Sequence, residues 1–295
     1  MNVIYHADDF GLSVAQSQAI LDCSAACGGT GTLNSTSMVV TSPNAAACAK
    51  LVAPHVEAGA IKLGLHLNLV EGPSCAPASE VGLLVNDRGM FCRSFANLLA
   101  ATTAAAPAAD LIAQVYVEVR CQLQAFLALF PNARGALRVD SHQHFHMIPV
   151  VFDALLDAIK QEGCTLEYMR IPSEPAAPFA ATPGLYRQYA PINGVKHSLL
   201  NVLWAVNKKK FPQWQERSAV FCGLVLSGRM ELVVQHGLLD RFQAYAAERG
   251  RALEVLFHPG GMDNAQDCLD PQLKGFVDFY LSPHRGLEAA ALRGL

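Results

Sequence analysis

Acidic and imidazole side chains interrupt the apolar segments of this 295-residue sequence at a few places. Asp8 and Asp9 follow the first apolar run, His66 lies in GLHLNL, a histidine-rich tract spans 142–146, and His258 precedes Pro-Gly. Each group alone has an ordinary structural explanation, such as a turn, a helix cap or a buried histidine. Their recurrence where apolar runs end predicts one shared site.

The residue types in these groups favour metal chemistry. The tract HQHFH carries three histidines at alternate positions, which an extended chain places on one side. A histidine-rich tract is typical of metal binding. Histidine and aspartate without a nearby cysteine suit Zn²⁺, Mn²⁺, Fe²⁺ or Co²⁺. Two histidines and one carboxylate leave positions open for water and substrate, as in hydrolytic metal sites.

The adjacent acids Asp8 and Asp9 can divide the work of such a site. One carboxylate would bind the metal, and the other would accept a proton from the attacking water. A separate histidine would protonate the leaving group. The residues alone leave open which acid takes which role.

Seven short apolar runs are predicted as strands, at 2–7, 33–41, 61–69, 135–139, 166–171, 218–226 and 252–257. Helices are predicted between them, at 14–26, 42–52, 110–130, 150–162, 195–211, 229–249 and 288–293. Alternating strands and helices indicate an α/β fold with a parallel sheet. The sequence has no GxGxxG after its first strand and no GxxxxGK[ST], so a distorted (β/α) barrel is favoured over an open nucleotide-binding sheet. The polar groups would then meet at the C-terminal face of about seven parallel strands.

Composition excludes several classes of protein. The sequence is 52% hydrophobic and 16% charged, which excludes a disordered chain. The net charge of −3 gives no basic excess for nucleic acid. No apolar run approaches the roughly 20 residues of a membrane span. Two carboxylates within the first nine residues argue against a signal peptide, so we expect a cytoplasmic protein with nine buried, unreactive cysteines.

We expect a single domain over 1–295, with inserted loops near 71–107 and 173–191 that are either lids or plain surface excursions. The stretch 195–211 combines apolar residues, Trp204 and three consecutive lysines. It is either an ordinary outer helix or an interfacial helix that gives weak peripheral contact with the inner face of a membrane. The sequence leaves open whether the chain forms a homo-oligomer.

Five motifs resemble those of the YdjC-like carbohydrate deacetylases, which include the diacetylchitobiose deacetylases. They are HADDFGLS at 6–13, GLHLNLVEG at 64–72, VDSHQHFHMIP at 139–149, RIPSEP at 170–175 and HPG at 258–260. RIPSEP and LSPHRGLE at 281–288 are most similar to the hopanoid-biosynthesis-associated branch, HpnK. The resemblance implies a distorted barrel related to the polysaccharide deacetylase fold.

The resemblance also implies a role for several residues. One divalent ion, zinc first and magnesium or another ion as alternatives, would be held by Asp9, His66 and His142. By analogy with the wider polysaccharide deacetylases, Asp8 would be the general base and His258 the general acid. Arg170 would orient the base or bind substrate.

The expected reaction is hydrolysis of the N-acetyl group of an N-acetylglucosamine-type sugar, with a hopanoid-linked glycoside as one candidate substrate. His144, His146 and Glu174 are expected to contact the substrate or to support the site. One alternative is another metal-dependent hydrolase, such as a phosphoesterase, which usually needs two metals. The other is a sugar- or lipid-binding protein with a degenerate site, which turnover of any N-acetylated sugar would exclude.

Overall fold

The structure is a computed structural model that describes residues 2–104 and 108–295. Its centre is one sheet of seven parallel strands, which confirms the seven predicted strands. The strands are β1 (Val3–Phe10), β2 (Ser35–Met38), β3 (Lys62–Leu67), β4 (Leu137–Ser141), β5 (Leu166–Met169), β6 (Val220–Cys222) and β7 (Leu253–Phe257). Nearly all of their side chains are buried, as expected of a parallel sheet covered on both faces.

The sheet is an incomplete barrel. Its strand order is β5-β4-β3-β2-β1-β7-β6. The strands β1 to β5 therefore pair consecutively, β6 pairs with β7, and the first strand pairs with the last, as in a (β/α) barrel. The edge strands β5 and β6 do not pair with each other. Among the described residues, one backbone hydrogen bond of 3.0 Å or less crosses this opening, from Met169 N to Arg217 O at 2.9 Å. The distorted barrel predicted from the sequence is therefore confirmed, with its distortion located between β5 and β6.

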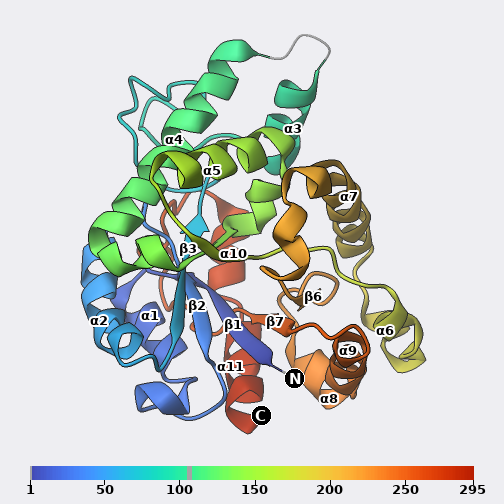
Figure 1. Cartoon of the computed structure of the whole chain (residues 1–295). Helices are drawn as coiled ribbons and strands as arrows, with labels where there is room; N and C mark the ends of the chain where they lie inside the picture. The colour runs from blue at the N-terminus through green and yellow to red at the C-terminus, as the bar shows by residue number, and fades with distance from the viewer. Residues whose placement is uncertain (1, 105–107) are drawn as a thin grey trace.

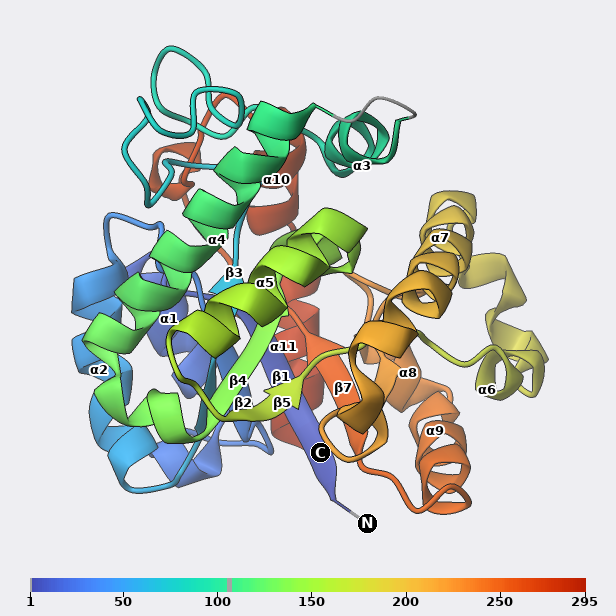
Figure 2. The same cartoon turned by 45° about the horizontal axis from the view of Figure 1, so that its top comes forward.

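Helices surround this sheet (Figures 1 and 2). They are α1 (Val14–Leu21), α2 (Ala45–Glu57), α3 (Phe95–Thr103), α4 (Ala109–Leu129), α5 (Pro149–Gln161), α6 (Ala177–Ala180), α7 (Pro191–Asn207), α8 (Glu231–Gln235), α9 (Leu238–Ala247), α10 (Lys274–Tyr280) and α11 (His284–Gly294). The single helix predicted at 229–249 is two helices, because Gly237 adopts a left-handed φ of +67° between them. The segment predicted as a loop at 71–107 contains α3, and its residues 105–107 lie outside the described part of the chain.

The orientation of α7 differs from the interfacial prediction. Trp204 is only 7% exposed and its ring contacts those of Phe152 and Trp214, so an insertion of Trp204 into a membrane surface is wrong. Of the three lysines that follow, Lys210 pairs with Asp153 at 2.7 Å. The exposed apolar side chains of α7 are Ile192, Val195, Val202 and Val206. Across residues 2–104 and 108–295, no helix is long and apolar enough to cross a bilayer.

Candidate active site

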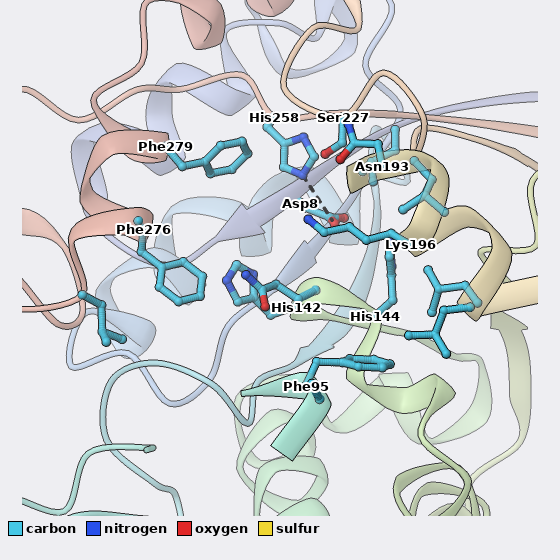
Figure 3. Close-up of a pocket in the computed structure, with 18 of the residues that line it drawn as sticks. Asp8, Phe95, His142, His144, Asn193, Lys196, Ser227, His258, Phe276 and Phe279 are labelled. Carbon is cyan, nitrogen blue, oxygen red and sulfur yellow. Dashed lines mark ion pairs between the residues drawn. The ribbon is translucent and has the colours of Figure 1, made fainter. Parts of the chain in front are cut away.

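The predicted polar groups meet at the C-terminal ends of the strands. β1 presents Asp8 and Asp9, β3 presents His66, and the segments that follow β4 and β7 present His142 and His258. All five are at least nine-tenths buried. A cavity of about 690 Å³ opens here, and Figure 3 shows the side chains that line it. The carboxylate and imidazole groups of the site therefore reach solvent through one opening.

A left-handed residue places both acids at the site. Successive side chains of a strand point to opposite faces, so Asp8 and Asp9 in regular β structure would diverge. Asp9 instead has a φ of +68°, and the pairing of β1 with β2 shifts register between Ala7 and Phe10. Gln16 Nε2 donates to the Asp9 carbonyl at 3.0 Å and holds this conformation. Such backbone strain in a non-glycine residue persists only where neighbours enforce it, commonly at functional sites.

Three ligand atoms converge behind the cavity. Asp9 Oδ1 lies 3.0 Å from His142 Nδ1 and 3.6 Å from His66 Nε2, and the two ring nitrogens are 3.3 Å apart. Tetrahedral zinc with bonds of about 2.0–2.2 Å separates its ligand atoms by about 3.3–3.6 Å. Asp9 Oδ1 is buried and accepts no well-aligned hydrogen bond from the described residues. The donor set and its spacing therefore fit one divalent ion.

Each ligand histidine is held by a carboxylate on its other ring nitrogen. Asp140 Oδ1 lies 2.6 Å from His66 Nδ1, and Glu71 Oε1 lies 3.1 Å from His142 Nε2. Such partners fix the ring orientation and the free nitrogen, here Nε2 of His66 and Nδ1 of His142. Burial opposes the charged form of His142, but Asp9 and Glu71 outweigh it and raise its pKa to about 10. Metal binding should therefore release a proton.

Asp140→Asn and Glu71→Gln are each expected to weaken metal binding by about 10–100-fold, because the neutral amide no longer fixes the imidazole or raises its basicity. Chelator competition would give the dissociation constants. Asp153→Asn is the matched control, since Asp153 pairs with Lys210 at the surface, away from the ligands. Wild-type affinity in both variants would contradict this function for Asp140 and Glu71.

The C-terminal helix α11 places a cation beside Asp9. Arg285 Nη2 donates to Asp9 Oδ2 at 2.9 Å, and the guanidinium lies 4.4 Å and 4.8 Å from the ring centres of Phe279 and Tyr280. This pairing engages one oxygen of Asp9 and leaves Oδ1 for the metal. Arg285 lies in the motif LSPHRGLE, but nothing in that local pattern indicates a contact with Asp9.

Asp8 is held by a buried arginine. Arg170 Nη1 and Nη2 donate to the two Asp8 oxygens at 2.9 and 2.8 Å, and Arg170 Nε donates to Glu254 at 2.8 Å. Arg170 Nη2 also lies 3.1 Å from Asp140 Oδ2. Burial opposes the charge of Asp8, but Arg170 holds its pKa well below the usual range. Asp8 is therefore ionised and oriented toward the cavity.

His258 faces Asp8 across the cavity floor, as Figure 3 shows. Its Nε2 lies 4.0 Å from Asp8 Oδ2, and its Nδ1 lies 3.8 Å from Glu288 Oε2 of α11. The backbone N–H of His258 also donates to Glu288. Burial of the ring lowers the pKa of His258 to about 4, so the ring is neutral at pH 7 in the free protein.

The three expected substrate contacts differ in position. His144 lines the cavity, and its Nδ1 makes no hydrogen bond within the described residues. His146 is fully buried away from the cavity, where it contacts Ser141 and the Arg170 carbonyl. Glu174 is also outside the cavity and accepts hydrogen bonds from three backbone N–H groups at 223–225. We therefore keep the substrate-contact hypothesis for His144 and assign His146 and Glu174 to support of the surrounding loops.

His146 is expected to make the protein sensitive to acid. Burial lowers its pKa to about 4, whereas an unfolded histidine titrates near 6.5. Between these values the unfolded chain binds the extra proton, so stability falls as the pH falls, by up to about 1.4 kcal/mol per pH unit for one proton. Denaturant titrations of wild type and His146→Asn should show the wild-type advantage shrinking from pH 6.5 toward pH 4. A pH-independent difference would contradict this assignment.

Comparisons with known proteins identify the family of this chain. The profile of the family described as YdjC-like protein matches residues 2–294. A mouse (Mus musculus) carbohydrate deacetylase is 32% identical over 177 residues, which is 59% of this chain and 51% of that protein. A chitooligosaccharide deacetylase of Salmonella schwarzengrund is 29% identical over 168 residues, 57% of this chain and 59% of that protein. The chain thus spans little more than half the length of the curated relatives it matches.

A solved structure supports the fold. The crystal structure of a putative cellobiose-phosphate cleavage protein from Enterococcus faecalis V583 superposes with a TM-score of 0.58 at 18% sequence identity, covering 100% of this chain and 96% of that one. At this identity the likeness concerns the fold alone. The profile match, in contrast, runs through β1, the ligand segments and α11. The chain belongs to the YdjC-like protein family.

Proposed function

We propose that this chain is a metal-dependent deacetylase that hydrolyses the N-acetyl group of an N-acetylglucosamine-type sugar. The observation that carries the proposal is the pairing of Asp8, ionised and held by Arg170, with the adjacent ligand set of Asp9, His66 and His142. The cavity supplies space for a sugar beside them. The names of the mouse and Salmonella relatives, carbohydrate deacetylase and chitooligosaccharide deacetylase, support the same reaction.

The residues of the chain can carry one proton from water to the amine. A divalent ion, when bound, polarises the acetyl carbonyl and acidifies the attacking water. Asp8 accepts the water proton as the carbon–oxygen bond forms. Because the pKa of Asp8 is low, Asp8 keeps this proton only briefly. His258 Nε2 lies 4.0 Å from Asp8 Oδ2 and can accept the proton from it. His258 then delivers the proton to the nitrogen as the carbon–nitrogen bond breaks, which leaves acetate and a free amino sugar.

The wall of the cavity supports a finer hypothesis about the substrate. Phe95, Leu199 and Phe276 make one side apolar, and the exposed Val195 of α7 lies beside the cavity-lining Lys196. These surfaces suit an amino sugar that carries an apolar aglycone, such as a hopanoid-linked glycoside. The exposed apolar residues of α7 would support weak peripheral contact with a lipid surface, and they are Ile192, Val195, Val202 and Val206. The buried Trp204 would take no part in that contact.

A two-metal phosphoesterase is less compatible with the charges of the site. Other acid–histidine groups lie nearby, and they include Asp8, Asp140 and Glu254. Arg170 lies within 3.1 Å of all three carboxylates. This guanidinium already neutralises the position where a second cation would bind.

The decisive experiment measures acetate release from N-acetylglucosamine, its β-1,4-linked disaccharide and a lipid-linked N-acetylglucosaminide. We expect acetate and free amine in equal amounts, loss of activity on chelation, recovery on metal addition, and about one metal per chain. Hydrolysis of phosphomonoesters without acetate release would replace the proposal. A preference for the lipid-linked compound would support the finer hypothesis, and its absence would reject that hypothesis alone.

His258→Gln is expected to lower the turnover number by about 10²–10⁴-fold while metal remains bound, because glutamine cannot carry the proton. Steady-state kinetics and metal analysis of the purified variant would test this expectation. His236→Gln is the control, since His236 ends α8 at a distance from the cavity lining. Wild-type turnover in His258→Gln would remove His258 from the mechanism.

A further inference from the structure

A second cavity, of about 590 Å³, lies beside the opening between β5 and β6. Its wall shares no residue with the active-site cavity. Ser173 and Glu174 of this wall follow β5, and Asn201 and Trp204 belong to α7. Trp214, Gln215 and Ser218 precede β6. Tyr245 belongs to α9, and Arg249 and Arg251 follow that helix. A volume of this size is typical of sites for small molecules.

Arg251 is the central cation of this wall. Its guanidinium lies 4.7 Å from the ring centre of Trp214, and its Nη2 donates to Ser218 Oγ at 2.7 Å. Its Nε is buried and makes no hydrogen bond within residues 2–104 and 108–295. No carboxylate of these residues lies within 4.0 Å of the guanidinium. A second cation, the partly exposed Arg249, lies over the ring of Tyr245 at 3.6 Å and pairs with the exposed Glu248 at 3.3 Å, where an anion could compete with the carboxylate.

Burying half of a guanidinium without a counter-ion costs free energy, because the group loses part of its hydration and gains no opposite charge in return. Glu174 is the one carboxylate among the lining residues. Its oxygens accept hydrogen bonds from Gly223, Leu224 and Val225, and burial raises its pKa to about 7. Glu174 therefore does not neutralise Arg251, and the wall keeps an excess of positive charge.

We propose that this second cavity binds a small molecule through an oxyanion, a phosphate or a carboxylate, that pairs with Arg251 and Arg249. A guanidinium offers planar N–H donors that match the oxygens of either group. Trp214 has Lys208 and Arg251 each 4.7 Å from its ring centre, which holds the arginine in place. Gln215 provides an amide for the polar body of the ligand.

Intrinsic fluorescence reports on this cavity directly. The sequence has two tryptophans, and both Trp204 and Trp214 line the second cavity, whereas neither lines the active site. The protein would be titrated with inorganic phosphate, glucose 6-phosphate, acetate and glucose at constant ionic strength. We expect a saturable change with phosphate compounds or acetate and none with glucose. The comparison of phosphate with acetate tells which oxyanion the site prefers. The proposal is overturned if phosphate, glucose 6-phosphate and acetate all fail to give a saturable change.

Variants locate the response. Arg251→Gln and Arg249→Gln should each raise the dissociation constant at least about tenfold, since each removes a charged hydrogen-bond donor. Arg241→Gln, which changes an exposed arginine of the preceding helix α9, should bind as wild type. Circular dichroism would show whether each variant is folded. If Arg251→Gln does not fold, the binding constant of Arg249→Gln decides the test. A response that survives both cavity substitutions but is lost in Asp8→Asn would place the ligand in the active site and reject the proposal.

Discussion

Replacing Asp8 with asparagine is expected to lower the turnover number for acetate release by about 10²–10⁴-fold while the metal stays bound. Asparagine keeps the size of the side chain but cannot accept the proton of the attacking water. It also breaks the bidentate pair with Arg170, whose N–H groups lie 2.8 and 2.9 Å from the Asp8 oxygens. Steady-state kinetics and metal analysis of the same preparation would test both halves of the prediction.

Asp9→Asn is the matched comparison, because the two acids are adjacent and equally isosteric with asparagine. Asp9 Oδ1 is 3.0 Å from His142 Nδ1, in the ligand set, so this variant should lose metal together with activity. Added metal should restore part of the activity of Asp9→Asn and none of that of Asp8→Asn. If the two variants hold metal equally, or if their behaviour is exchanged, the division of roles between the acids is wrong.

Removing either ligand histidine is expected to abolish tight metal binding. Within the part of the chain that the structure describes, His66 and His142 are two of the three side chains whose atoms converge on the proposed position of the ion. An alanine at either position leaves two ligands, too few for a stable tetrahedral site. Metal content after dialysis would fall from about one per chain to near zero, and acetate release would fall with it.

His144→Ala is the control for this experiment. His144 is also buried and lies two residues after His142, but it is not in the ligand set. The His144→Ala variant should keep its metal. Circular dichroism would show that His66→Ala, His142→Ala and His144→Ala are all folded. Full metal content in His66→Ala or His142→Ala would contradict the assignment of ligands.

The sequence alone predicted the strands and the polar groups that meet at their ends. All seven strands form near their predicted positions, because short β-branched and apolar runs bounded by polar residues carry the signal for a buried parallel strand locally. Asp8, His66 and His258 lie at the ends of those strands, and in a barrel such ends share one face. Any fold with these strands in parallel therefore brings these groups together.

Contacts across the fold decided between alternatives that the local pattern left open. The apolar residues at 199–206 predict a helix, which is either an outer helix with its apolar stripe inward or an interfacial helix. Packing against Phe152 and Trp214 buries Trp204 and leaves Val202 and Val206 exposed. Periodicity marks an apolar face, whereas the neighbours of a helix decide how much of that face is covered.

What the sequence determined by itself is thus the strand pattern and the chemical types at the strand ends. Only the tertiary structure decided how those groups are held. The left-handed conformation of Asp9 breaks the alternation that a strand pattern implies, and it depends on Gln16 and Arg285. Arg285 reaches Asp9 across 276 residues of sequence, because α11 packs against the segment that holds Cys23 and Thr32 and against α8. A contact between residues so far apart depends on the folded arrangement of the whole chain, and no local sequence pattern encodes it.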